Sequence, residues 1–490
     1  MAIAVERPSI LRDRAYIGGA WAPADDGRTF AVVNPATGET VADVPRMGTS
    51  ETRRAIEAAG AALSEWRAKT AKERGALLRR WFELVTAHRD ELATIMTLEQ
   101  GKPLGEARGE VGLGASYLEW YAEEAKRVYG DTIPTAWTDR RQVVIKQPIG
   151  VGVGITPWNF PHAMVTRKAA PALAAGCTFV LKPAEQTPLS ALAVAALAEE
   201  AGIPAGVFNV VTGDAEDAPT IGAEMTSNPT VRKLGFTGST AVGKMLMAQC
   251  AATVKKVSLE LGGNAPFLVF DDADLDAAVS GAMLAKFRNA GQVCISPNRI
   301  YVQEKVYDAF VDRLSQKVAK LRVGNGLEEG VTMGPLVDMQ GFTKVAEHVD
   351  DARKRGAKAV IGGAPSKLGR TFFEPTILID VDDSMRMSCE ETFGPVAGIA
   401  RFKTESDAIA MANATPFGLA SYFYSRDIGR VWRVAEALEA GMVSINSGFF
   451  TNEAMPFGGV KESGIGREGS KYGIEEWVEV KYLSFAGLDT

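Results

Sequence analysis

The chain has 490 residues, more than one hydrophobic core normally supports, so two or three domains are expected. It carries 54 lysines and arginines against 60 acidic residues, and the resulting net charge of −6 repels nucleic acid. Hydrophobic residues make up 46 % and charged residues 23 %, a globular composition that excludes a disordered or fibrous protein. No apolar stretch reaches the roughly 18 residues of a membrane span, so neither nucleic acid nor a membrane is an expected partner.

Cysteine usage and the start of the chain indicate the compartment. The four cysteines include no C-x-x-C pair, which argues against a disulfide framework and against a structural zinc site. Only a short apolar stretch precedes Glu6 and Arg7, too short for the core of a signal peptide. We therefore expect a cytoplasmic protein that binds no metal.

The predicted elements begin with helices. Ser50 can cap a helix, and the apolar residues that follow recur with the period of an amphipathic helix. The recurring positions are Ile56, Ala59, Leu63 and Trp66. Helical patterns continue to about Tyr129.

Beyond Gly150, β-rich runs alternate with alanine-rich helical segments such as Leu189–Ala201. The first set of expected strands is Val151–Ile155, Thr178–Leu181, Val207–Val211 and Lys233–Phe236. The second set is Phe267–Phe270, Arg299–Val302 and Lys358–Ile361. This βαβ rhythm predicts an α/β fold with parallel strands in two successive domains.

Two β-prone runs lie outside this rhythm. Arg140–Gln147 precedes the first sheet and has no helix to pack on, and Glu475–Ser484 lies at the tail of the chain. The two runs could pair with each other or add to the sheet of another subunit. They therefore favour an oligomer.

The sequence disfavours histidine-based and zinc-based catalysis. The three histidines, His88, His162 and His348, are widely separated. Neither a G-x-S-x-G elbow nor an H-E-x-x-H motif occurs. A serine hydrolase and a catalytic zinc site are therefore not expected.

A glycine-rich loop at Gly238–Lys244 meets the first seven positions of the P-loop pattern, but Met245 stands where a magnesium-binding hydroxyl is required. The loop follows the expected strand Lys233–Phe236 and opens a helix, whose free amides suit a dinucleotide pyrophosphate. The alternative is a glycine turn in which Ser239 only caps the helix. ATP hydrolysis is disfavoured, whereas the cofactor site and the plain turn both remain open.

Cys294 and Glu260 are the candidate reactive residues. Cys294 lies on irregular backbone between a helix and a strand, where Arg288 could help to form a thiolate. Most cysteines are buried fillers, and Cys177 and Cys250 lie within apolar patterns. Glu260 ends a strand and precedes two glycines; desolvation there would raise its pKa and suit a general base, and a solvated strand-end glutamate is the alternative.

Taken together, seven sequence blocks resemble the aldehyde dehydrogenase superfamily, in that family's order. They are TPWNFP at 156–161, LKPAE at 181–185, GFTGST at 235–240, LELGG at 259–263, GQVC at 291–294, ETFGP at 391–395 and PFGG at 456–459. The resemblance extends from about Asn34 to Tyr482. Some members of the superfamily are structural proteins, but such a protein need not keep Cys294, Glu260 and Asn159, all of which are present here.

The resemblance implies covalent catalysis by Cys294. Its thiolate attacks the aldehyde, and the Asn159 amide with the Cys294 backbone amide holds the oxyanion. Hydride transfer to a nicotinamide leaves a thioester, which Glu260 hydrolyses by activating water. CoA-acylating relatives lack a carboxylate at this position, so the sequence resembles the hydrolytic branch. Lys168 and Glu468 match residues that the family associates with a proton path and with support of the base.

The resemblance also places a dinucleotide. The matching residues are Thr156, Pro157, Trp158, Lys182, Glu185, Gly238, Ser239, Gly262, Glu391 and Phe393. A carboxylate at Glu185 can accept a hydrogen bond from the ribose 2′-hydroxyl and would repel a 2′-phosphate. NAD is therefore the expected cofactor, with NADP possible.

Within the superfamily, the chain is most similar to succinate-semialdehyde dehydrogenases. Arg167 and Arg288 match their carboxylate-binding arginines, and Thr451 falls where they place a serine that contacts the same carboxylate. The resemblance implies a carboxylated aldehyde as substrate, with succinate semialdehyde first. Phe449 is bulkier than the usual aliphatic residue, so glutarate and 2-oxoglutarate semialdehydes are alternatives. If the arginines formed only surface ion pairs, the chain would be a general aldehyde dehydrogenase.

The resemblance predicts how the chain divides. A Rossmann-like dinucleotide domain would comprise residues 1–128 and 149–262, and an α/β catalytic domain residues 263–470. An oligomerisation arm would comprise residues 129–148 and 471–490. A homodimer or homotetramer is expected.

Overall fold

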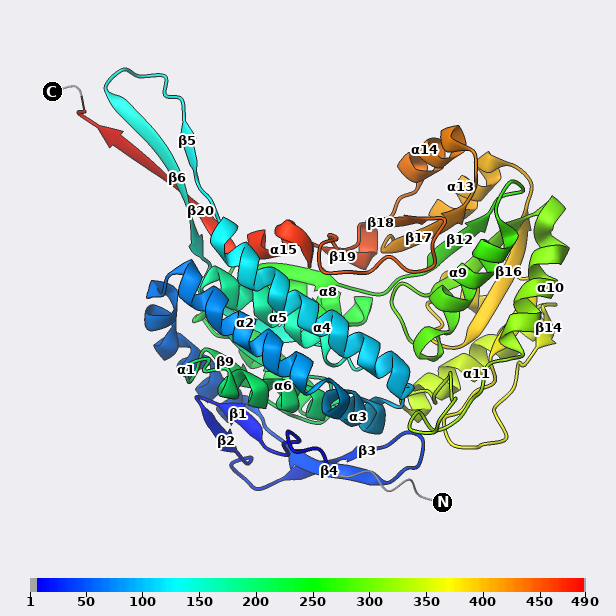
Figure 1. The fold of residues 1–490 in the computed structure, drawn as a ribbon, viewed down its shortest axis with the longest axis horizontal. Helices are drawn as coiled ribbons and strands as arrows, with labels where there is room; N and C mark the ends of the chain where they lie inside the picture. The colour runs from blue at the N-terminus through cyan, green and yellow to red at the C-terminus, as the bar shows by residue number, and fades with distance from the viewer. Residues whose placement is uncertain (1–6, 489–490) are drawn as a thin grey trace.

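A computed structural model describes residues 7–488 of the chain. Two large sheets occupy the left and right halves of the body, and a small third sheet projects from it (Figure 1). The first six residues, part of the segment tested for a signal peptide, lie outside the described residues, as do the last two residues of the predicted arm.

The first sheet has eight strands in the order β19-β11-β10-β7-β8-β9-β1-β2. Its parallel centre consists of β7 (Val151–Ile155), β8 (Thr178–Lys182), β9 (Phe208–Val210), β10 (Val231–Thr237) and β11 (Lys256–Glu260). The antiparallel edges are β19 (Gly464–Ile465), β1 (Ala15–Ile17) and β2 (Ala20–Ala22). The four predicted strands of this half are confirmed, because strands buried on both faces read as continuous apolar runs.

Helices cover both faces of the first sheet. One face packs against α1 (Thr49–Ala68), α7 (Ala218–Ser227) and α8 (Thr240–Ala251). The other packs against α5 (Ala163–Ala175) and α6 (Pro188–Glu200), which α2 (Ala71–Ala87), α3 (Arg89–Gln100) and α4 (Leu104–Glu124) cover in turn. The hairpin of β3 (Thr29–Val33) and β4 (Thr40–Pro45) lies at the edge of the body.

The predicted cap of the first helix is wrong. Helix α1 begins at Thr49 and its cap is Gly48, not Ser50. The reason is that the Glu51 carboxylate accepts the Gly48 backbone N–H at 3.0 Å, so the helix is capped two residues before Ser50.

The second sheet has seven strands in the order β14-β15-β16-β13-β12-β17-β18. The strands are β12 (Ala265–Val269), β13 (Pro297–Gln303), β14 (Lys358–Ile361), β15 (Thr376–Ile379), β16 (Val396–Phe402), β17 (Ala420–Tyr424) and β18 (Met442–Ile445). The helices are α9 (Leu275–Phe287), α10 (Tyr307–Val318), α11 (Met339–Lys354), α12 (Arg386–Cys389), α13 (Glu405–Asn413) and α14 (Ile428–Ala437). The three predicted strands are present, but β14 pairs antiparallel with β15, so the parallel prediction is wrong at this edge. Between residues 7 and 488, no helix combines the length and apolarity needed to cross a membrane.

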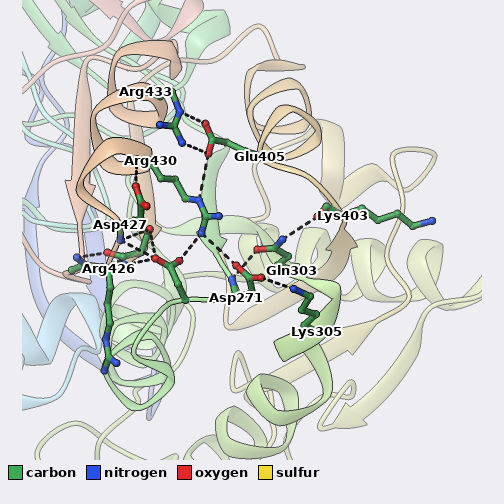
Figure 2. A network of polar contacts seen from close by, with 12 residues as sticks. Asp271, Gln303, Lys305, Lys403, Glu405, Arg426, Asp427, Arg430 and Arg433 are labelled. Atoms are coloured by element: carbon green, nitrogen blue, oxygen red, sulfur yellow. Dashed lines mark hydrogen bonds and ion pairs between the residues drawn. The ribbon is translucent and has the colours of Figure 1, made fainter.

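An ion-pair network lies beyond the carboxyl end of β12 in the second sheet (Figure 2). Arg430 of α14 pairs with Asp272 at 2.6 Å and with Glu405, the first residue of α13, at 3.3 Å. The same guanidinium lies 4.8 Å from the centre of the Phe270 ring. Because Asp272 follows β12, the network ties both helices to the end of a central strand.

The third sheet is an arm formed by three strands. These are β5 (Asp131–Ile133), β6 (Arg140–Pro148) and β20 (Val478–Ala486), in the order β20-β6-β5. Strand β6 pairs antiparallel with β20 along its whole length, and the arm extends away from the body (Figure 1). Of the two predicted pairings, the structure therefore shows the one within the chain. The tail strand begins at Val478 and not at Glu475, because α15 (Ser470–Glu475) occupies the residues before it.

Candidate active site

A cavity of about 310 Å³ lies where loops from both large sheets meet. The predicted residues that line it are Pro157, Trp158, Asn159, Gly238, Ser239, Glu260, Gly262, Cys294, Glu391 and Phe393. Those from the first sheet follow the carboxyl ends of β7, β10 and β11, where ligands bind in open α/β sheets. The fold thus brings together residues that are up to 236 positions apart, Pro157 and Phe393.

Left-handed backbone delivers Cys294 to the cavity. After α9 ends at Phe287, Asn289, Ala290 and Gly291 have φ values of 50°, 53° and 74°. Gly291 is required here because a Cβ would lie 2.1 Å from the Gly394 carbonyl oxygen. The strained turn reverses the chain, and strain of this kind is typical of functional sites.

Cys294 is a half-buried thiol. Burial raises its pKa to about 12, and the negative charges of Glu391 and Glu260 add to this effect, while Arg167 and Arg288 oppose it. The thiol form therefore dominates at neutral pH, and the two arginines favour the thiolate that a nucleophile requires.

Asn159 presents an amide beside the nucleophile loop. Its Nδ2 atom donates to the carbonyl oxygen of Gln292 at 3.1 Å, two residues before Cys294. An amide nitrogen carries two hydrogens, so one remains for an oxygen in the cavity. The side chain is buried, which strengthens any hydrogen bond it makes to a developing negative charge.

Two buried carboxyl groups have pKa values that are shifted in opposite directions. Glu260 has both carboxylate oxygens buried without a hydrogen-bond partner among residues 7–488, and burial together with the charge of Glu468 raises its pKa well above the ordinary value. Burial would also raise the pKa of Glu468, but Lys168 and Arg167 offset this and hold that pKa below its ordinary value. Glu468 pairs with Arg167 at 2.6 Å and with Lys168, whose Nζ also donates to the Thr237 hydroxyl at 2.6 Å. Burial therefore favours the neutral form of Glu260, while Lys168 and Arg167 favour the ionised form of Glu468, a division that suits a general base with a supporting group.

A second cavity of about 370 Å³ continues from the first and could hold the adenosine half of a dinucleotide. Thr156, Lys182 and Glu185 line it, and Lys182 pairs with Glu185 at 3.4 Å. The residues common to both cavities are Pro157, Trp158, Gln186, Thr237 and Gly238. Ser239 caps α8 between them, where helix amides can bind a pyrophosphate. The groove thus fits an extended dinucleotide, and both predictions for Ser239, cofactor loop and helix cap, describe the same position.

Glu391 and Phe393 form the other end of this groove. The Glu391 carboxylate accepts the Gly263 backbone N–H at 3.2 Å, and a Cβ on Gly262 would lie 3.2 Å from the same carboxylate. Burial raises the pKa of Glu391 to about 7. The rings of Phe393 and Trp158 meet edge to face with centres 5.4 Å apart. A flat ring such as nicotinamide would enter next to this aromatic pair.

The four predicted substrate residues lie outside these two cavities. Arg167 is buried, pairs with Glu468, and donates to the sulfur of Met164, a cavity residue, at 3.0 Å. Arg288 is half-buried, with its guanidinium carbon 5.4 Å from the centre of the Phe160 ring and 5.2 Å from that of Phe449. Neither arginine therefore lies in a surface ion pair of the kind considered as the alternative.

Arg288 and Thr451 keep unused polar atoms. The Nε atom of Arg288 and the hydroxyl of Thr451 are buried, and neither has a hydrogen-bond partner among the described residues. Phe449 is 45 % exposed and stacks on Arg288. Buried donors without partners are costly, which indicates that a polar ligand satisfies them.

Several cavity residues were missed from the sequence. They are Met164, Gln186, Thr237, Gln292, Asp338, Gln340 and Lys344. Gln292 lies two residues before Cys294 in a quoted motif and could have been found there. Asp338 caps α11 and Lys344 lies within it, and this helix reaches the site only through the tertiary fold.

Comparisons with known proteins agree with this geometry. Residues 21–483 match the Aldehyde dehydrogenase family. The glutarate-semialdehyde dehydrogenase of Pseudomonas aeruginosa is 64 % identical over 98 % of this chain and 99 % of that protein. The NADP(+) succinate-semialdehyde dehydrogenase GabD of Escherichia coli is 61 % identical over 97 % of this chain and 98 % of that protein.

The fold is similar to solved structures as well. The crystal structure of succinate-semialdehyde dehydrogenase from Burkholderia pseudomallei matches with a TM-score of 0.96 and 61 % identity, covering 98 % of this chain and 99 % of that one. Sequence and fold therefore both show that the chain belongs to the aldehyde dehydrogenase family, enzymes that oxidise aldehydes with NAD or NADP.

Proposed function

We propose that the protein oxidises a short aldehyde with a carboxylate at its far end, succinate semialdehyde first and glutarate semialdehyde as the alternative. The observation that carries this proposal is Arg288, a half-buried cation that contacts two aromatic rings and has an unused Nε donor. A carboxylate would satisfy that donor, and the Thr451 hydroxyl is a second buried polar group without a partner among the described residues. Relatives named for these two semialdehydes, more than 60 % identical, support it.

The chain's own residues account for the chemistry. When bound, the dinucleotide supplies the hydride acceptor. The Cys294 thiol loses its proton to water, and the thiolate adds to the aldehyde carbon. The Asn159 amide with the Cys294 backbone N–H holds the resulting oxyanion. Loss of hydride leaves a thioester on Cys294. Glu260 then takes a proton from water, whose oxygen attacks the thioester and releases the carboxylate and the free thiol.

Arg288→Met tests the substrate class. The variant keeps the packing against both rings but loses the cation, so we expect kcat/KM for succinate semialdehyde to fall about 100-fold. For butanal, which has no carboxylate, kcat/KM should change less than about threefold. Arg401→Met is the matched control. The guanidinium carbon of Arg401 lies 3.6 Å from the centre of the Tyr307 ring, but Arg401 lines neither cavity. Equal losses with both aldehydes would show that Arg288 is only structural.

We propose NAD as the preferred cofactor, because Glu185 lies in the groove where the adenosine ribose would bind. Its carboxylate would repel a 2′-phosphate, whereas Lys182 would attract one. Glu185→Gln should therefore lower the ratio of kcat/KM for NAD to kcat/KM for NADP by about tenfold or more. A ratio that does not fall would contradict this role of Glu185.

We also propose the domain division, the assembly and the location that the sequence predicts. The division at residues 262 and 263 is supported by the change of sheet between β11 and β12, and the projecting arm supports a homodimer or homotetramer. All four cysteines are free thiols, which supports a reducing, cytoplasmic location.

A further inference from the structure

A buried ion pair connects the start of α4 to the site. Lys102 precedes the helix, Glu110 lies within it, and their charged groups are in contact with side chains that are each 1 % exposed. Burying two charges costs free energy that the pair itself does not always recover. Such a pair therefore calls for an explanation in the groups that surround it.

Both members of the pair bind the segment that carries Asn159. The Lys102 ammonium donates to the Asn159 carbonyl oxygen at 2.6 Å and lies 4.2 Å from the centre of the Phe160 ring. Glu110 accepts the backbone N–H groups of His162 at 3.0 Å and Ala163 at 3.2 Å. These are the first amides of α5, so residues 159–163 are fixed at both ends.

The next acidic residue on the same helix face binds the nucleophile loop. Glu106, four residues before Glu110, accepts the backbone N–H of Asn289 at 2.8 Å. The Asn289 side-chain amide donates to the carbonyl oxygens of Asn159 at 3.1 Å and of Gln292 at 3.3 Å. The two loops are thus joined to each other and to a single helix.

We propose that Lys102, Glu106 and Glu110 are positioning residues that hold the Asn159 amide in register with Cys294. The inference rests on the proposed roles of Asn159 and Cys294. No member of the trio lines the cavity, so each acts through the loops. An oxyanion donor displaced by about 1 Å loses much of its effect, and misplacement of that size can cost about 100-fold in rate.

A double-mutant cycle tests this proposal. Lys102→Met and Glu110→Gln nearly keep side-chain size, and each should lower kcat by about 10- to 100-fold, with KM for the aldehyde changed less than about threefold. In an Asn159→Ala background the same substitutions should lower kcat by less than about twofold, because the amide they position is gone. If one of the two variants does not fold, the other and Glu106→Gln, measured in the same two backgrounds, complete the test.

Glu99→Gln is the matched control. Glu99 is a buried acid that accepts the Leu189 and Ser190 amides at 2.7 and 2.8 Å and so caps α6, as Glu110 caps α5. It should lower the melting temperature about as much as Glu110→Gln but leave kcat at saturating cofactor unchanged. Equal losses of kcat with and without Asn159, or a control variant as slow as Glu110→Gln, would overturn the inference.

The cycle separates this inference from the proposed function. It is run with whichever aldehyde the wild-type enzyme oxidises fastest, so a preference for uncharged aldehydes would refute the substrate proposal and leave the positioning result intact. If Asn159→Ala alone leaves kcat unchanged, both the role of Asn159 and the positioning inference are refuted.

Discussion

Replacing Cys294 by alanine will lower the rate of NADH formation by about 10⁴-fold or more, because the reaction loses its only covalent carrier. The sulfur lies where loops of the two large sheets meet. Asn159 approaches from the first sheet, and the left-handed turn at residues 289–291 presents the thiol from the second. No other cysteine lines either cavity. The measurement is NADH absorbance under saturating aldehyde and cofactor.

Cys250→Ala is the control for this experiment. Cys250 is a buried thiol near the end of α8, and it lies outside both cavities. It should retain kcat within about twofold, and the Cys294→Ala protein should still show a melting temperature raised by NAD, since the cofactor groove is unchanged. Turnover that survives in Cys294→Ala would refute covalent catalysis by this residue.

Replacing Glu260 by glutamine should uncouple the two halves of the reaction. Addition of the thiol and hydride loss do not need this carboxylate, so one NADH per active site should form rapidly. The following turnover should be about 10³-fold slower than in the wild type, because no base activates water. A single slow phase without a burst would contradict the assignment of Glu260 to thioester hydrolysis.

The same prediction extends to pH. Glu260 acts as a base only when it is deprotonated, and burial together with Glu468 raises its pKa well above the ordinary carboxyl value. The wild-type hydrolysis rate should therefore rise with pH above the range in which exposed carboxyl groups titrate, and this rise should be absent in Glu260→Gln. Glu476→Gln is the control, because Glu476 pairs with Lys233 and contacts Ser258 on the same strand, β11, but lines neither cavity.

The fold was predictable where the local pattern matched the burial. Strands β7 and β14 were predicted to the residue, and β6 was found from an isolated β-prone run. The strands β1 to β4 were not predicted, because each has only three to six residues and none lies in an alternation of strands with helices. The antiparallel direction of β14 was also beyond the sequence, since pairing direction depends on the path of residues 362–375 between the two strands.

The site was predictable where a motif marks a loop. Cys294, Glu260 and Asn159 each belong to a quoted block, and the fold gathers all three in one cavity. What the blocks could not reveal were partners distant in sequence. Arg167 was predicted only as a substrate residue, yet it pairs with Glu468, 301 positions away, and Lys102 reaches Asn159 across 57 positions.

The most direct test of the account is the mass of the acyl group trapped on the Glu260→Gln enzyme. The protein is mixed with NAD and equal concentrations of succinate semialdehyde, glutarate semialdehyde and pentanal, quenched after the burst, digested and analysed by mass spectrometry. The account predicts a succinyl or glutaryl group on the peptide that contains Cys294. A pentanoyl group on Cys294, an acyl group on another residue, or no adduct at all would contradict it.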